Sequence, residues 1–516
     1  MTDGYTYQHG AQQGRPRRAI SWRRWVPLAL GLVLAAVALA SILGLERRFD
    51  GLDVRAADVG STPVTLYSLP AAEPQPLVVV AHGFGGSRQM MDQISVTLAR
   101  AGFAVAAFDF PGHGRNPQPL SRDVTSLDGT TAQLVAVTQE VARAMSARDD
   151  IAGPISFVGH SMATDVIIRA AEETPDLGAL VAISMYSEAV TPQFPQDLLI
   201  VSGASEGHLR AVALEAVRML QAEAQEGDLV RQGDTSRQAI AAPFVGHVGV
   251  LYSETTLDAA ADWLSRAVGE RWRVESDTSG ITAGLLLLAL TGLAWPMSRL
   301  LPARPQAASN DLPRRQFWMA VGLPVLPAVG VTLLIPATVG PAAGFATLAG
   351  FFGIWGGVQL ILLRRFGQAF PRVDAWASAA LLVWGLAVFA LALDRYGAAF
   401  LPSGPRVPVM ALLALGTVPL MLADAMLLGS ASLWRRLVAR FAILLALSAA
   451  MALNAQDLAL TFTVLPVFVL FVLVYGSFAR WISERRGAGS AALAQGVCLA
   501  WALAASTPLF STQLLP

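Results

Sequence analysis

The chain has 516 residues, of which 54% are hydrophobic and only 14% are charged, whereas a typical soluble domain is about 25% charged. Much of it is therefore expected to lie in a lipid bilayer. The formal net charge of zero argues against a nucleic-acid partner. The single cysteine, Cys498, excludes an internal disulfide and argues against a thiolate metal site.

The first 45 residues predict a membrane anchor. Residues 1–25 are basic, and residues 26–45 form an apolar stretch close to the roughly 20 residues that a transmembrane helix needs. A signal peptide is the alternative, because Ala38-Leu39-Ala40 resembles a cleavage site. Since the apolar core of a signal peptide is normally only about 7–15 residues long, we expect an uncleaved anchor that follows a cytoplasmic N-terminus.

Residues 50–275 have the composition of a soluble domain in which strands and helices alternate. An antiparallel pair is expected at 52–68, and the later apolar runs suit strands buried on both faces. These strands are expected at 77–81, 103–108, 155–158, 179–184, 198–202 and 238–242, and helices at 90–101, 130–147, 162–173, 206–225 and 255–268. The alternation predicts an α/β fold with a doubly wound, mostly parallel sheet.

The segment Gly159-His160-Ser161-Met162-Ala163 lies between an expected strand and an expected helix. A Gly-x-Ser-x-small pattern in this context is typical of a nucleophile elbow. The turn is strained and needs small neighbours, and it holds the serine hydroxyl at the carboxyl edge of the sheet. Ala163 stands where glycine is more usual, although alanine is still small.

Five segments in order make residues 55–268 resemble the α/β-hydrolase superfamily. They are His82-Gly83-Phe84-Gly85-Gly86, Asp109-Phe110-Pro111-Gly112-His113-Gly114, the turn around Ser161, Leu199-Ile200-Val201-Ser202-Gly203-Ala204-Ser205-Glu206, and Gly246-His247-Val248-Gly249. In that family the chain order of the triad is Ser, then Asp or Glu, then His.

The resemblance implies that Ser161 is the nucleophile, His247 its general base and Glu206 the acid that orients the histidine. A serine hydroxyl needs such a base because it is a poor nucleophile by itself. The acid position stays open, because the family more often has Asp there; Asp228 and Asp234 are the alternatives to Glu206. His208 is a weaker alternative to His247.

The same resemblance places the oxyanion hole at the backbone N–H groups of Phe84 and Met162. The loops that would shape the substrate site carry five further candidates: His82, Gly83, His113, Met185 and Tyr186. The sequence shows no metal-ligand cluster, phosphate loop or dinucleotide fingerprint, so no metal and no cofactor are expected. Only about ten residues, 188–197, separate two consecutive strands where lipases often insert a cap. We therefore expect no cap domain and an open site, shaped by loops near Phe84, His113, Met185 and Tyr186.

Residues 280–516 predict an all-α membrane domain of about eight helices, which makes about nine spans with the anchor. The expected spans are 280–298, 317–336, 345–363, 375–393, 407–428, 441–453, 459–478 and 490–510. If the N-terminus is cytoplasmic, 18 arginines fall in inside segments and two, Arg395 and Arg406, in short outside loops. Because positive charge in short loops stays cytoplasmic, the soluble domain and the C-terminus are predicted on the outer side of a cell (inner or plasma) membrane.

These features predict a membrane-bound serine hydrolase that cleaves an ester through an acyl-enzyme. A lipid or an acylated envelope component is the expected substrate, and membrane lipids are the expected surroundings. One alternative is a transport or lipid-handling protein that uses the hydrolase fold as a sensing or delivery domain. Another is an inactive hydrolase fold used for binding.

Overall fold

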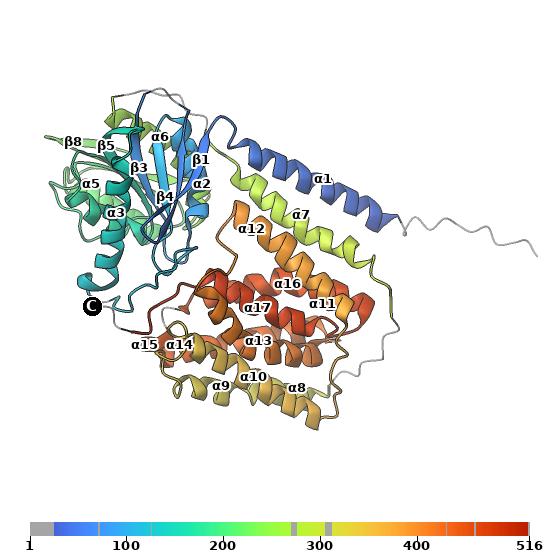
Figure 1. The fold of residues 1–516 in the computed structure, drawn as a ribbon. Helices are drawn as coiled ribbons and strands as arrows, with labels where there is room; N and C mark the ends of the chain where they lie inside the picture. Colours follow the sequence, from blue (N-terminus) through green and yellow to red (C-terminus); the bar gives the residue numbers. More distant parts are fainter. Residues whose placement is uncertain are drawn as a thin grey trace, which may run out of the picture.

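The computed structural model describes residues 25–70, 73–124, 126–269, 276–304, 312–429, 431–458 and 461–513. The basic segment before residue 25, most of the predicted cytoplasmic N-terminus, lies outside them. An α/β domain and a bundle of helices lie side by side, and the helices α1 and α7 lead into and out of the α/β domain (Figure 1).

The α/β domain is built on a nine-stranded sheet in the order β1-β2-β4-β3-β5-β6-β7-β9-β8. Strands β1 and β2 pair antiparallel at one edge, and β8 pairs antiparallel with β9 at the other. The six strands β4, β3, β5, β6, β7 and β9 are parallel to one another. The interiors of β3, β4, β6 and β7 are almost wholly apolar and buried, whereas β9 also carries the polar run Thr235 to Gln238. The bounds are β1 Asp53–Val59, β2 Thr62–Ser68, β3 Gln75–Ala81, β4 Ala104–Phe108, β5 Ile151–His160, β6 Leu177–Ile183, β7 Asp197–Gly203, β8 Leu229–Gln232 and β9 Thr235–Ala242.

Helices cover both faces of the sheet. Apolar side chains of α2 (Asp92–Arg100) and α6 (Glu254–Ala267) share one core, and those of α3 (Ala132–Ser146), α4 (Ala163–Glu172) and α5 (Gly207–Arg218) share the other. The doubly wound α/β prediction is confirmed. Two details differ: the helix expected at 206–225 ends at Arg218, and the short strand β8 was not predicted. Only residues 184–196, without a helix, separate β6 from β7, so no cap domain is inserted there.

The helical part contains most of the remaining elements. Their bounds are α1 Val26–Arg47, α7 Gly280–Ser298, α8 Arg314–Gly322, α9 Val325–Thr332, α10 Phe345–Arg365, α11 Ala375–Leu382, α12 Ala390–Tyr396, α13 Arg406–Leu428, α14 Leu433–Leu453, α15 Ala455–Leu458, α16 Val464–Arg486 and α17 Ala492–Ser506. Within the described residues, seven helices are long and apolar enough to cross a membrane, α11 and α12 counting as one, which marks the chain as a membrane protein.

Two of the nine predicted spans differ from simple long helices. The span expected at 317–336 is broken into α8 and α9 at Pro324, a residue that cannot donate a backbone hydrogen bond. The span expected at 490–510 is α17, whose 15 residues reach only about 22 Å. The number of spans therefore stays a prediction.

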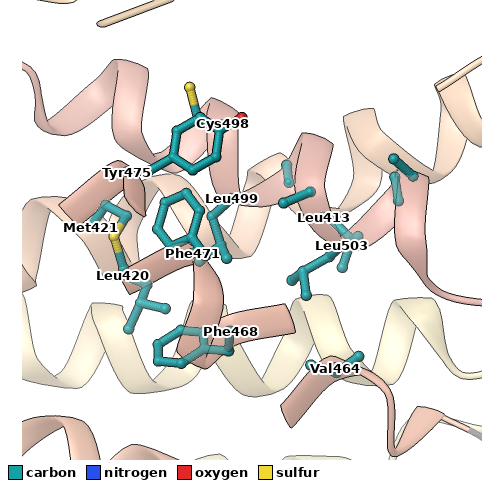
Figure 2. Packing of buried hydrophobic residues seen from close by; sticks show 14 of the residues in the cluster. Leu413, Leu420, Met421, Val464, Phe468, Phe471, Tyr475, Cys498, Leu499 and Leu503 are labelled. Carbon is teal, nitrogen blue, oxygen red and sulfur yellow. The ribbon is translucent and has the colours of Figure 1, made fainter. Parts of the chain in front are cut away.

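The bundle has a continuous apolar core. Side chains of α13, α16 and α17 meet in it, among them Leu413 and Met421, Phe468 and Tyr475, and Leu499 (Figure 2). In a bilayer such packing replaces the hydrophobic effect as the source of helix association.

Four segments of the bundle lie at the end that contacts the α/β domain. We call this the domain-facing end, made of residues 333–344, 397–405, 461–463 and 507–511. Ala337, Ala343 and Phe510 from these segments belong to one of the two cores of the α/β domain. A buried ion pair of 2.7 Å between Arg48, just after α1, and Asp92 of α2 joins the end of α1 to the same domain.

Candidate active site

Ser161 stands on a sharp turn between β5, which ends at His160, and α4, which begins at Ala163. Its φ angle is 54°, a left-handed conformation that is strained for any residue other than glycine. The backbone N–H of Ser161 donates to the carbonyl of Ile183 at 2.8 Å and thereby ties the turn to β6. This is the elbow geometry expected from the sequence.

The small residues of the motif allow the helix to pass close to the strand. A Cβ atom on Gly159 would lie 2.8 Å from the carbonyl oxygen of Ala163. Ala163 is itself fully buried. Any larger side chain at position 159 would push α4 away and move the Ser161 hydroxyl.

His247 and Glu206 join Ser161 in one hydrogen-bonded chain. His247 Nε2 lies 2.8 Å from Ser161 Oγ, and His247 Nδ1 lies 2.6 Å from Glu206 Oε1. Glu206 follows β7 and His247 follows β9, so neighbouring strands of the sheet deliver both residues to the same edge. The arrangement suits a proton passing from the serine hydroxyl to Nε2 while Nδ1–H donates to the carboxylate.

The carboxylate of Glu206 is held in its charged form. Burial would raise its pKa, but hydrogen bonds from the Ser184 hydroxyl at 2.7 Å, the Gly203 N–H at 2.6 Å and His247 lower the pKa below its ordinary value. An ionised Glu206 is what a charged imidazolium on His247 would need for stabilisation. Ser184, which sequence analysis missed, has a φ of 53°, and nothing in its sequence neighbourhood signals this contact.

Two backbone N–H groups are available for an oxyanion. Among the described residues, the N–H groups of Phe84 and Met162 have no protein acceptor. Gly83 brings the loop near the nucleophile, because a Cβ atom there would lie 3.1 Å from Ser161 Cβ and 2.9 Å from His160 Nδ1. Two unpaired donors beside a serine hydroxyl are suited to stabilise a tetrahedral intermediate.

Three other histidines surround the site, and all are buried. His160 Nε2 donates to the His247 carbonyl at 2.8 Å, and burial lowers the pKa of His160 to about 4. His82 accepts from the Phe110 N–H at 3.1 Å, and His113 donates to the Pro111 carbonyl at 2.9 Å. Burial also lowers the pKa of His82 and His113, so all three rings are neutral near pH 7.

The remaining site residues predicted from the sequence differ in their exposure and their contacts. Both Met185 and Tyr186 lie in the loop after β6, where Tyr186 is 58% exposed and Met185 is 1% exposed and packs in a core. Asp228 accepts from the backbone N–H of Gln225 in a turn, and Asp234 lies in the β8–β9 turn. His208 is exposed and is the second residue of α5. His247 Nδ1 thus pairs with Glu206 and not with either aspartate.

The site is less open than we expected from the absence of a cap domain. The ring of Phe84 stacks on Phe462 from the bundle, with centroids 5.3 Å apart and planes 16° apart. His113 is buried, although a surface loop was expected there. The bundle therefore closes the oxyanion side, while His247 and Tyr186 remain accessible.

Nothing in the described part of the chain resembles a metal centre, because no group of three or more His, Cys, Asp or Glu side chains is placed to hold an ion.

Comparison with known proteins places the α/β domain among hydrolases. A family model described as "serine aminopeptidase, S33" matches residues 72–247, a range that contains Ser161, Glu206 and His247. A monoglyceride lipase homolog of Monkeypox virus is 28% identical over 111 residues, which are 22% of this chain and 38% of the viral protein. The chain therefore matches well under half the length of that relative.

Solved structures that resemble the α/β domain include two bacterial or archaeal hydrolases. A predicted CIB-like hydrolase from Thermoplasma acidophilum is 17% identical, with a TM-score of 0.34 over 42% of this chain and 98% of that one. A dienelactone hydrolase from Anabaena variabilis is 19% identical, with a TM-score of 0.33 over 43% of this chain and 100% of that one.

Proposed function

Because residues 72–247 belong to the α/β-hydrolase superfamily, we propose that this membrane protein is a serine hydrolase that cleaves an ester through an acyl-enzyme. The observation that carries the proposal is the chain of contacts from Ser161 to His247 to Glu206, at 2.8 and 2.6 Å.

The reaction would proceed in two steps. Ser161 Oγ attacks the ester carbonyl carbon while its proton moves to His247 Nε2. The carbonyl oxygen takes the negative charge and accepts from the N–H groups of Phe84 and Met162, a contribution of about 3–4 kcal/mol for each donor. His247 then gives the proton to the departing alcohol, which leaves an acyl group on Ser161. Water repeats the sequence, releases the acid and restores the serine.

An apolar rim supports a substrate with an aliphatic part. Phe244 lies three residues before His247, is fully exposed, and has a strained φ of 60°. Val248 follows His247 and is 50% exposed, and Tyr186 is 58% exposed. Exposed apolar side chains gathered at a site are a sign of an apolar ligand. A lipase among the relatives favours the same substrate class.

A fluorophosphonate probe tests the nucleophile in the full chain. Wild type should be labelled, Ser161→Ala should not be labelled, and the control Ser146→Ala on α3 should be labelled at the wild-type rate. Labelling that survives Ser161→Ala would overturn the assignment. Because the matching family model names an aminopeptidase, turnover should be measured on short and long esters and on aminoacyl amides; turnover of the amides alone would contradict an esterase.

The α/β domain is proposed to lie outside the cytoplasm. The arginine distribution supports this side. Contacts with the α/β domain support the same side. Segment 397–405 lies in a predicted outside loop, and segments 461–463 and 507–511 lie at the outer ends of the predicted spans 459–478 and 490–510. Alkaline phosphatase fused after residue 516 should be active in a bacterial host. If that fusion is inactive and a fluorescent protein fused at the same position is fluorescent, the C-terminus lies in the cytoplasm and the proposed orientation is wrong.

A cavity favours lipid handling as the second candidate function. It measures about 520 Å³ and lies between the ends of α13, α14, α16 and α17 remote from the α/β domain. Arg436, Arg440 and Arg480 line it beside apolar side chains such as Leu437 and Leu473. Asp424 and Glu484 also line it and pair with Arg440 at 2.6 Å and Arg480 at 3.7 Å, so these five side chains carry one excess positive charge. Basic pockets between membrane helices bind anionic lipid headgroups. Lipid movement that persists in the Ser161→Ala protein would favour this candidate, and loss of movement with loss of labelling would favour the hydrolase.

A further inference from the structure

We propose that the domain-facing end of the helical bundle takes the place of the missing cap and positions the oxyanion loop, residues 82–87, mainly through Phe462 and Arg406. The inference rests on the proposed function, because an oxyanion loop has meaning only in a serine hydrolase. It gives the membrane bundle a part in the reaction beyond anchoring.

Phe462 contacts the middle of the oxyanion loop. The backbone N–H of Phe84 is the proposed oxyanion donor. Its ring stacks on Phe462, with centroids 5.3 Å apart, and lies 6.2 Å from the ring of Phe510. Only two side-chain torsions separate this ring from the backbone, so fixing the ring restricts the direction of the N–H. The next residue, Gly85, lies against Thr463: a Cβ atom there would be 3.2 Å from Thr463 Cγ2. The loop therefore rests directly on residues 461–463.

Arg406 acts on the oxyanion loop indirectly, because it bonds to the neighbouring loop after β4. Arg406, the first residue of α13, is 3% exposed, and its guanidinium donates to four backbone carbonyls. Two belong to the bundle, Ala504 at 2.7 Å and Thr507 at 2.8 Å. The other two belong to the α/β domain, Gly112 at 2.8 Å and Gly114 at 3.1 Å. A buried cation must be satisfied in this way, so the bonds fix the two parts relative to each other.

The loop after β4 carries this constraint to the oxyanion loop. The Phe110 N–H donates to His82 Nε2 at 3.1 Å, and Asp109 accepts from the Arg88 N–H at 2.8 Å. These two contacts hold the oxyanion loop at its first residue and just beyond its last. The Ala399 N–H of the bundle also donates to the Ser87 hydroxyl at 3.0 Å. The loop is thus fixed at both ends by contacts that lead to the bundle.

The last described segment of the chain completes the support. The Leu509 N–H donates to the Gly112 carbonyl at 2.9 Å, and the Leu120 N–H donates to the Leu509 carbonyl at 2.8 Å. This pairing places Phe510 against Phe84.

The oxyanion loop needs external support because three of its six residues, Gly83, Gly85 and Gly86, are glycines. Glycine allows the chain to pass close to Ser161 but gives the backbone little stiffness of its own. An oxyanion donor must lie about 2.7–3.1 Å from the developing charge to be effective. Contacts from the bundle supply the stiffness that the loop lacks.

The test uses the full chain in detergent or nanodiscs, with Phe462→Ala, the conservative Phe462→Tyr and the control Leu334→Ala. Leu334 is a 79% exposed apolar residue at the same end of the bundle. For p-nitrophenyl butyrate, Phe462→Ala should lower kcat about tenfold, within the range for impaired oxyanion stabilisation, with little change in KM. Inhibition by a trifluoromethyl ketone, whose adduct places an oxyanion in the same hole, should weaken by a similar factor. Phe462→Tyr should restore both, and Leu334→Ala should match wild type.

Rates are divided by the fraction of protein that a fluorophosphonate labels, so that unfolded molecules do not count. Arg406→Gln should act in the same direction, and Phe462 keeps the test decisive if that variant does not fold. If Phe462→Ala has the wild-type inhibition constant and the wild-type kcat per labelled molecule, the inference is overturned and the proposed function stands. Absence of Ser161-dependent labelling in wild type would overturn the proposed function, and the inference with it.

Discussion

The two halves of the candidate active site are held by different parts of the molecule. Around Glu206 and His247, the supporting contacts come from the α/β domain itself, through Ser184, Gly203 and His160. Around Phe84, the helical bundle adds Phe462 and Phe510 to the contact that His113 of the α/β domain makes. The proton-transfer half, made of Ser161, His247 and Glu206, can therefore form when the α/β domain folds. The oxyanion half, the loop around Phe84, also depends on the position of the helical bundle. Changes in the bundle should impair one half and spare the other.

The largest expected effect comes from a change in the proton-transfer half of the site, which the α/β domain holds. Glu206→Gln keeps the shape of the side chain but removes the negative charge that stabilises an imidazolium on His247. We expect kcat to fall by roughly 10³–10⁴-fold, as for the acid of other serine triads, with KM little changed. Asp228→Asn is the matched control, measured with the same ester. A larger loss in Asp228→Asn than in Glu206→Gln would move the acid role to the aspartate.

An intermediate effect concerns His160, which touches both halves: it donates to the His247 carbonyl and lies against Gly83. The pKa of His160 is about 4 in the folded chain, while an unfolded histidine has a pKa of about 6.5. The unfolded chain binds the extra proton first, so stability is lost as pH falls from about 6.5 towards 4. His160→Gln should flatten the fall of Tm with pH across that window, relative to wild type, in thermal unfolding of the purified full chain. A curve parallel to that of wild type would show that His160 does not control acid stability.

The smallest expected effect comes from a change at the apolar rim of the site. Phe244→Ser removes a fully exposed ring and should lower kcat/KM for a long-chain ester about three- to fivefold, since partial burial of an aromatic ring contributes about 1 kcal/mol. The value for an acetate ester should stay the same. Leu229→Ser, a change at an exposed position on β8, serves as the control. Equal losses on both esters would exclude Phe244 from contact with the acyl chain.

The α/β domain was largely predictable because its signals are local. Each strand of the parallel sheet is a short apolar run, and Ser161, Glu206 and His247 each follow one. Parallel strands deliver such residues to a common edge, so chain order was enough to expect that they meet. The burial of the Met185 side chain beside the exposed Tyr186 was not predictable, because it depends on the course of the loop after β6.

The support of the oxyanion loop was not predictable, because it depends on contacts between distant segments. Phe84 and Phe462 are separated by more than 300 residues, as are Gly85 and Thr463. Arg406 was counted only as an outside charge, since nothing in its neighbourhood indicates that it bonds to Gly112 and Gly114. A membrane-helix pattern predicts which residues cross the bilayer but not what the ends of the helices touch.

Trapping the acyl-enzyme tests the central claim most directly. The full chain is mixed with a slowly deacylating p-nitrophenyl ester, quenched in acid, digested and analysed by mass spectrometry. The account predicts that the peptide containing Ser161 gains the mass of the acyl group, and that Ser161→Ala gains none. Turnover of the ester without an adduct on Ser161, or with the adduct on another residue, would contradict it.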